Sequence, residues 1–326
     1  MKRFPIWILM LLCCVFLLSG CTHAANPLAA VEATPLPGAA QELHQATASE
    51  NNVSTLEVTL FFRYLNYPFL AGEDRTLTVK KDESNETALL RALLEGPTAE
   101  KTDLRRLFSE EVSLKEVSAS GDMLFVTLSS SFLKDEVPSD WQNQAQWKNE
   151  APILRLLTVQ SLVNSITESL PYTSVQIMID RAEGSKSNTR LEKSYFLTGG
   201  SGPADPLSRR EDLILTAHNT AALLMQAWQE RDFETLYAFT STYADYQTRP
   251  VYDDFLNAMD ASPTLTDYSL TPGSTSESGQ HSTLSLNLSL RGEKGETRVE
   301  AYPLRLVREN AVWKVTFQTL QDLMLR

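Results

Sequence analysis

The stretch Asn-Glu-Thr-Ala-Leu-Leu-Arg-Ala-Leu-Leu-Glu-Gly-Pro, residues 85–97, decides the fold of the first half of the chain. It predicts a helix from Glu86 to Glu95, with Asn85 able to cap its N-terminus. Gly96 can adopt a positive φ after the last turn, and Pro97 prevents the helix from continuing. The apolar side chains lie on one side of this helix, at Leu89, Leu90, Leu93 and Leu94. The pattern therefore indicates an amphipathic helix with a defined end.

Alternating apolar residues predict strands around this helix. Leu56, Val58 and Leu60 alternate with polar residues, and the stretches 112–117 and 123–129 flank a turn, which favours a hairpin. A second helix is expected from about 153 to 170, followed by a strand that contains Val175, Ile177 and Ile179. Helices and strands in this order predict an α+β fold.

Two motifs in this region resemble a known family. They are Leu-Leu-Glu-Gly-Pro at 93–97 and Gly-Asp-Met-Leu-Phe-Val-Thr-Leu-Ser-Ser-Ser-Phe at 121–132, followed by a helix and an alternating strand. The segment from about Leu56 to Asp180 resembles the GerMN domain of sporulation and spore-germination proteins, although Thr127 stands where that family usually has Asp. The resemblance implies an α+β domain of Gram-positive envelope lipoproteins, linked to sporulation, germination or wall-associated assembly. It implies no established reaction.

The N-terminus has the anatomy of an export signal. Lys2 and Arg3 precede an apolar run from Phe4 to Leu18, which is shorter than the roughly 20 residues that span a bilayer. The tetrapeptide Leu-Ser-Gly-Cys at 18–21 resembles the lipobox of bacterial lipoproteins. We therefore expect cleavage before Cys21, lipidation of that cysteine, and anchoring on the outer face of the cell membrane. An ordinary secreted protein is the alternative.

The second half predicts a separate α+β unit. A Gly- and Ser-rich segment precedes a long helix expected from Pro206 to Arg231, shorter helices at 233–239 and 251–259, and strands at 284–290, 298–307 and 312–319. This order resembles the cone-shaped nuclear transport factor 2-like fold. The expected organisation is a signal peptide (1–20), a lipidated cysteine and disordered tether (21–53), a GerMN-like domain (54–198), a linker (199–208) and a nuclear transport factor 2-like domain (209–326).

Charge and residue types exclude several classes of function. The formal charge is -12, and removal of Lys2 and Arg3 leaves -12 - 2 = -14, which repels nucleic acid. Cys13 and Cys14 lie in the signal, so no thiol remains for a disulfide or a metal once Cys21 is lipidated. The four histidines are widely spaced, and no phosphate-binding loop is present. We expect no cofactor, no metal, no catalytic residue and therefore no enzyme.

Two sets of aromatic residues are candidate binding sites. Trp141 and Trp147 have Gln and Asn neighbours, a combination that suits sugar rings or a protein partner, although both side chains can equally fix a loop onto the domain. A second set on the later helices can either line a pocket or fill a core: Tyr237, Tyr243, Tyr246 and Tyr252. A general base would also need an oxyanion donor, which spacing does not reveal.

Two hypotheses follow. The first is a membrane-anchored, non-enzymatic envelope protein that binds peptidoglycan or a protein complex in sporulation or germination. The second is a small-molecule sensor or isomerase-like enzyme that uses a pocket of the C-terminal domain.

Overall fold

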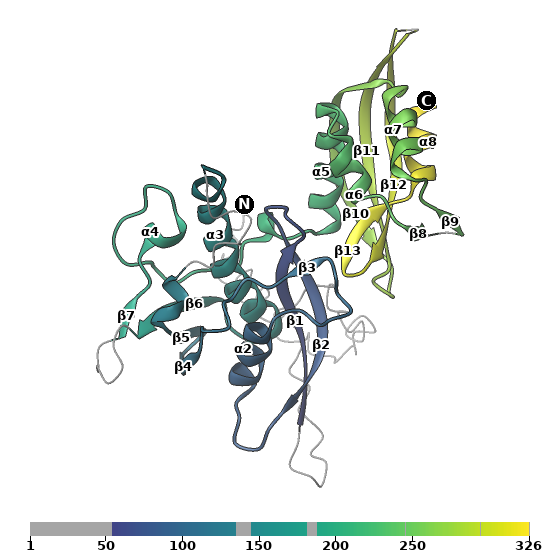
Figure 1. The fold of residues 1–326 in the computed structure, drawn as a ribbon. Coiled ribbons are helices and arrows are strands. Elements are labelled where there is room, and N and C mark those ends of the chain that lie inside the picture. Colours follow the sequence, from purple (N-terminus) through teal and green to yellow (C-terminus); the bar gives the residue numbers. More distant parts are fainter. Residues whose placement is uncertain (1–53, 135–144, 181–187, 245, 294, 326) are drawn as a thin grey trace, which may run out of the picture. The chain divides into compact units, whose positions relative to one another are not determined.

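The computed structural model describes residues 54–134, 145–180, 188–244, 246–293 and 295–325. The signal peptide, Cys21 and the tether lie outside the described residues. Helices and sheets occur in both halves, so the predicted α+β class is confirmed (Figure 1). No helix in the described part is long and apolar enough to cross a bilayer. Two folded regions follow one another, and each is described by itself.

A three-stranded antiparallel sheet opens the first region. Its order is β2-β1-β3, with strands β1 (Ser54–Tyr64), β2 (Leu70–Val79) and β3 (Leu104–Arg105). Helix α2 (Asn85–Glu95) packs on β1 and β2. Leu89, Leu90 and Leu93 are fully buried, as the helical spacing predicts. The N-cap is Ser84 rather than Asn85, because the Ser84 hydroxyl accepts the Thr87 N–H at 3.2 Å.

A second sheet of four strands completes this region. Its order is β4-β5-β6-β7, with strands β4 (Leu114–Ser120), β5 (Met123–Ser129), β6 (Ser174–Asp180) and β7 (Asn188–Arg190). The expected hairpin is present, since β4 and β5 are antiparallel and joined by Gly121-Asp122. The 3-10 turn Ser130–Leu133 follows β5. Strands β5 and β6 are parallel, and helix α3 (Ala145–Ser169) lies in the connection between them. Helix α3 contacts both β1 and β6, so it joins the two sheets.

Serine side chains of α3 satisfy the backbone along one edge of β1. Ser169 and Ser165 accept the N–H groups of Thr59 and Phe61, both at 2.9 Å, while Ser161 donates to the Phe61 carbonyl at 2.5 Å. Four residues of helix rise about 6 Å, and two residues of strand advance about 6.6 Å. The two repeats match closely, so Ser169 and Ser165, four residues apart on α3, meet Thr59 and Phe61, two residues apart on β1.

The segment expected as a linker has contacts with the first region. Residues 203 and 207 form isolated bridges with Glu192 and Val175, and Leu207 and Val175 exchange backbone hydrogen bonds of 2.9 Å. The short helix α4 (Lys193–Phe196) precedes this segment. Residues 206–216 are not part of the long helix, since their helical part is limited to a 3-10 turn (Glu211–Leu213) and Thr216 caps the helix that follows.

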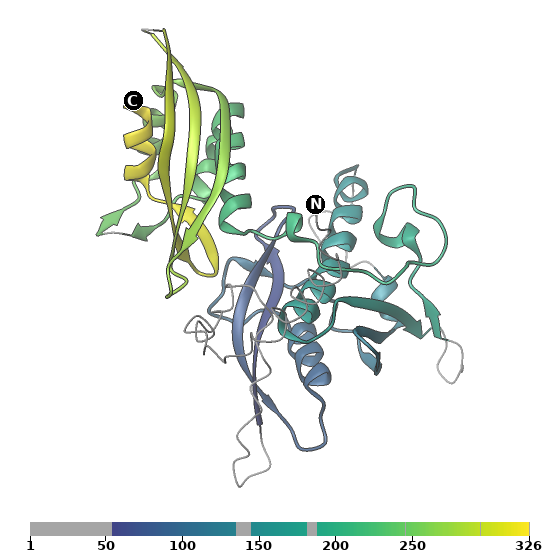
Figure 2. The same ribbon diagram turned by 180° about the vertical axis from the view of Figure 1, so that it is seen from behind.

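The second region places helices before an antiparallel sheet, as the change of period predicts. Three helices come first: α5 (Ala217–Glu230), α6 (Phe233–Ala238) and α7 (Tyr252–Asp260). A short hairpin of β8 (Tyr243–Ala244) and β9 (Gln247–Thr248) lies between α6 and α7 in the chain. The sheet, which Figure 2 shows from behind, has the order β10-β11-β12-β13 with strands Thr264–Thr275, His281–Gly292, Gly295–Glu309 and Val312–Val315. Helix α5 contacts β10, and its side chains Ala221, Leu224 and Trp228 are fully buried.

Two elements of this region differ from expectation. Strand β10 lacks clean alternation and was not predicted. The last strand ends at Val315, and helix α8 (Phe317–Met324) follows because the Thr316 hydroxyl caps it by accepting the Thr319 N–H at 3.2 Å. The nuclear transport factor 2-like assignment stays a prediction.

Candidate functional site

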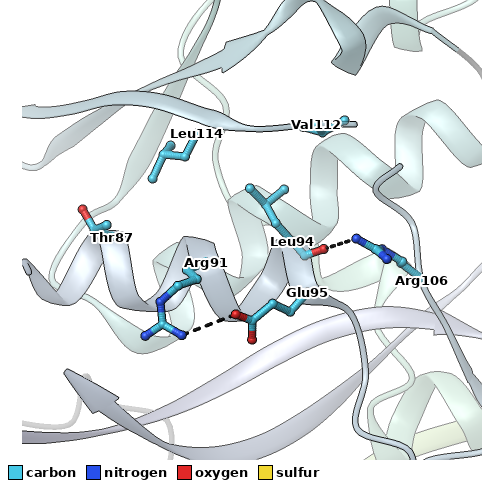
Figure 3. Close-up of a pocket in the computed structure, with 7 residues that line it drawn as sticks. All are labelled: Thr87, Arg91, Leu94, Glu95, Arg106, Val112 and Leu114. Carbon is cyan, nitrogen blue, oxygen red and sulfur yellow. Dashed lines mark hydrogen bonds and ion pairs between the residues drawn. The ribbon is translucent and has the colours of Figure 1, made fainter. Parts of the chain in front are cut away.

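A shallow groove of about 430 Å³ runs along helix α2 (Figure 3). One wall comes from α2 and the other from residues 106–114, which lead into β4. The lining residues are Thr87, Arg91, Leu94, Glu95, Arg106, Val112 and Leu114. The Leu-Leu-Glu-Gly-Pro motif thus does more than end a helix, because Leu94 and Glu95 form part of the groove.

Gly96 allows the end of α2 to close against Arg106. Its φ of 94° and ψ of -174° fall in a region that essentially only glycine adopts. A Cβ atom at this position would also lie 3.2 Å from Cγ of Arg106. With glycine there, Arg106 reaches over the helix end and donates to the Leu94 carbonyl at 2.8 Å. Glycine therefore fixes where one wall of the groove meets the other.

The buried carboxylate of Glu73 stabilises the turn that follows α2. Glu73 is 2% exposed and binds Arg75 and the Thr98 hydroxyl, both at 2.6 Å. Arg75 in turn donates to the Gly96 carbonyl at 2.7 Å. Burial alone would raise the pKa of Glu73, but the hydrogen bonds from Arg75 and Thr98 and the charge of Arg75 outweigh it, so the pKa is lowered. Glu73 is therefore ionised at neutral pH and orients the turn.

The charged groups of the groove are already paired with each other or with neighbours. Arg91 binds Glu83 at 3.0 Å and Glu95 at 3.5 Å, and Arg106 binds Glu110 at 2.9 Å. The hydrogen bond from Arg91 lowers the pKa of Glu83. The remaining lining residues are the apolar Leu94, Val112 and Leu114, together with Thr87. This arrangement suits the binding of an apolar side chain, because the apolar lining is bordered by charged groups that already have partners.

Of the two predicted tryptophans, only Trp147 is described, and it does not line this groove. Trp147 lies in the first turn of α3 and is half-buried, and Trp141 falls outside the described residues. In the described part of the chain, no three His, Cys, Asp or Glu side chains are grouped as metal ligands would be. The proposed binding role of Trp141 and Trp147 stays a prediction.

The four predicted tyrosines fall into two pairs. The Tyr237 ring packs edge-on against Tyr252 and Phe255, with centroids 5.1 Å apart in both cases, and its hydroxyl donates to the Pro250 carbonyl at 3.1 Å. Tyr243 and Tyr246 lie on the β8–β9 hairpin and are 61% and 94% exposed. Tyr237 is thus packed in the local core, Tyr252 packs on it with one side and stays 38% exposed, and Tyr243 and Tyr246 face solvent. The pocket stays a prediction.

Sequence reasoning missed most of the groove. The motif at 93–97 pointed to α2, but Arg106 comes from an irregular segment, and the strand predicted at 112–117 does not by itself place Val112 and Leu114 beside α2. The Gly96-Pro97 break predicts that the chain leaves the helix there. It does not specify the direction in which the chain returns.

Comparison with known proteins bears on the first region. Residues 63–184 match the Germane family, described as sporulation and spore germination. Among solved structures, the tandem GerMN domains of the sporulation protein GerM from Bacillus subtilis are similar at 16% identity and a TM-score of 0.34. That match covers 52% of this chain and 50% of the other, so it spans half the length of that relative.

Two further structures are similar over other shares of the chain. A putative lipoprotein from Clostridium perfringens has 16% identity and a TM-score of 0.26, with 51% of this chain and 95% of that one covered. The helical cell shape determining protein Pgp2 from Campylobacter jejuni has 12% identity and a TM-score of 0.22, with 80% and 73% covered. No curated protein matches the sequence. The first folded region is therefore similar, over residues 63–184, to the Germane family of sporulation and spore-germination domains, as its two motifs predict.

Proposed function

We propose that the chain is a lipid-anchored, extracytoplasmic protein that acts in sporulation or germination by binding wall glycan or an envelope protein complex. The observation that carries this proposal is the Germane match at residues 63–184, which lies behind a Leu-Ser-Gly-Cys sequence at 18–21. A domain of this kind on an anchored chain would act where it is held, at the outer face of the cell membrane. Its role would then be to keep a partner near that surface.

The groove on α2 supports binding rather than catalysis. Leu94, Val112 and Leu114 give it apolar lining, and its arginines and Glu95 are in ion pairs. A general acid or base needs a carboxylate or imidazole that can exchange a proton with a substrate at working pH. The groove instead offers a place for an apolar side chain, with charged groups fixed at its rim.

Anchoring is tested by replacing Cys21 with serine in the full chain. Without the thiol no lipid can be attached, so Cys21→Ser should move the protein from the membrane fraction to the soluble fraction after signal cleavage. Cys14→Ser is the matched control, since it removes a thiol from the segment that is expected to be cleaved off. A Cys21→Ser protein that is processed and still membrane-bound would contradict the anchor.

Binding is tested with the full-length chain in a mild detergent. We expect retention on purified peptidoglycan or co-purification of an envelope protein, weakened several-fold by Trp141→Ala or Trp147→Ala because tryptophan side chains often dominate such contacts. Trp313→Ala, which changes a half-buried tryptophan of the second region, is the control. Failure to retain either kind of partner would refute the proposal, as would turnover of a metabolite that stabilises the chain.

A further inference from the structure

Large apolar side chains are exposed together on one short segment of the second region. Tyr243 is 61% exposed, Tyr246 94%, Val251 66% and Tyr252 38%, all within ten residues that run from the β8–β9 hairpin into α7. We call these four side chains the tyrosine surface. Exposed apolar groups that are gathered in this way, rather than scattered singly, mark interaction sites.

The tip of the hairpin holds Tyr246 in an unfavourable backbone conformation. Pairing of Ala244 with Gln247 leaves a two-residue turn, and Tyr246 has a φ of 65° there. Asn or Gly is the usual residue at such a position, because a bulky side chain is strained at positive φ. A tyrosine that is both strained and 94% exposed contributes neither turn stability nor core packing. Strain of this kind points to a role outside the fold itself.

The base of the hairpin is fixed before any partner arrives. Arg249 donates to the carbonyls of Tyr237 and Thr240 at 2.7 and 3.0 Å, and its guanidinium lies 3.8 Å from the centre of the Tyr237 ring. The Arg249 N–H also donates to the Thr242 carbonyl at 3.0 Å. A partner would therefore meet a preorganised surface and lose less conformational entropy on binding.

Carboxylates border the tyrosine surface. Asp253 and Asp254 follow Tyr252 in the first turn of α7, and both are exposed. Neither forms an ion pair with another described residue, whereas the Arg249 charge is directed at carbonyl groups and a ring. The border is thus negative, which favours a cationic partner and disfavours anionic lipid headgroups. A neutral sugar could donate hydroxyl hydrogen bonds to these carboxylates, but it would gain no charge pairing from them.

We propose that the tyrosine surface binds an extended segment of a partner protein in which lysine or arginine side chains lie beside apolar ones. Tyrosine rings provide apolar contact area and attract cations over their faces, and the two carboxylates pair with the basic groups. The inference goes beyond the proposed function, because it concerns the second region and holds whether or not the first region binds an envelope component.

The test measures binding of a fluorescent octapeptide of alternating lysine and leucine to the full-length chain in a neutral detergent. Tyr243→Ala with Tyr246→Ala should weaken binding by about tenfold or more, because aromatic anchors dominate such surfaces. Asp253→Asn with Asp254→Asn should weaken it several-fold and reduce its salt dependence. Glu57→Gln with Glu100→Gln removes the same charge from exposed sites on the first region, away from the α2 groove, and should leave the affinity unchanged.

Tyr246→Gly separates binding from folding. Glycine relieves the positive φ, so this variant should melt at the same or a higher temperature than the original chain while its affinity for the peptide falls. Unchanged affinity in Tyr246→Gly would overturn the proposal, as would equal binding of a glutamate-leucine octapeptide. Competition by an N-acetylglucosamine oligomer or by phosphatidylglycerol vesicles, lost in the same tyrosine variants, would overturn it in favour of a sugar or membrane site.

Discussion

Ser165 connects helix α3 to strand β1, and its replacement by alanine tests how the first region is held together. Its hydroxyl is fully buried and accepts the Phe61 N–H at 2.9 Å. In Ser165→Ala this N–H stays buried without an acceptor, which costs about 1–3 kcal/mol. Alanine favours the helix by at most about 0.5 kcal/mol. We therefore expect the free energy of unfolding of the first region to fall by about 2 kcal/mol.

Urea unfolding followed by near-ultraviolet circular dichroism measures this change, and thermal unfolding should shift by about 4–8 °C in a region of this size. Hydrogen exchange of a peptide spanning 56–64 reports the Phe61 amide directly. Thr167→Ala is the control, because the Thr167 hydroxyl bonds only within its own helix, at 2.9 Å to the Val163 carbonyl. If both variants lose less than about 0.5 kcal/mol, the reasoning about the strand edge is refuted.

Two further predictions concern the turn after α2. Gly96→Ala should cost about 2 kcal/mol in urea unfolding, more than Gly121→Ala, whose φ of 63° and open surroundings are less demanding; equal losses would contradict the role of Gly96. The pKa of Glu73 is lowered by Arg75 and Thr98 against burial, so the unfolded chain binds more protons near pH 4. The stability that Glu73 contributes at neutral pH should be lost as the pH falls below about 4.3, the usual pKa of Glu, towards the lower pKa of Glu73 in the folded chain. The Glu73→Gln variant should lack this loss. Identical profiles of stability against pH for the two proteins would contradict the stabilising role of ionised Glu73.

Periodicity predicted the regular elements of this protein because it is a local property of the chain. The helix that ends at Gly96, the hairpin around Gly121 and strand β6 form where the spacing of apolar residues places them. The helices and strands of the second region also occur in the predicted order, although α5 begins at Ala217 rather than Pro206. The match to the Germane family confirms what the motifs at 93–97 and 121–132 indicate.

The candidate sites depended on contacts that no local pattern encodes. A spacing of four residues between Ser161, Ser165 and Ser169 was visible, but nothing in it names β1 as the partner. The side chain of Arg106 reaches the groove only because the chain returns over Gly96. Tyr246 and Tyr237 are the same residue type, and no sequence pattern separates them. Yet Tyr246 is exposed, whereas Tyr237 packs on α7.

The sequence by itself determined the α+β class, the Germane-like region and the lipobox-like segment, because each depends on residues that are neighbours in the chain. Only the tertiary structure decided which leucine of α2 lines a groove, which serines meet the edge of β1, and which tyrosines face solvent. These outcomes depend on where distant segments meet. Which side chains are buried, and which groups they hydrogen-bond, depends on these contacts between distant segments.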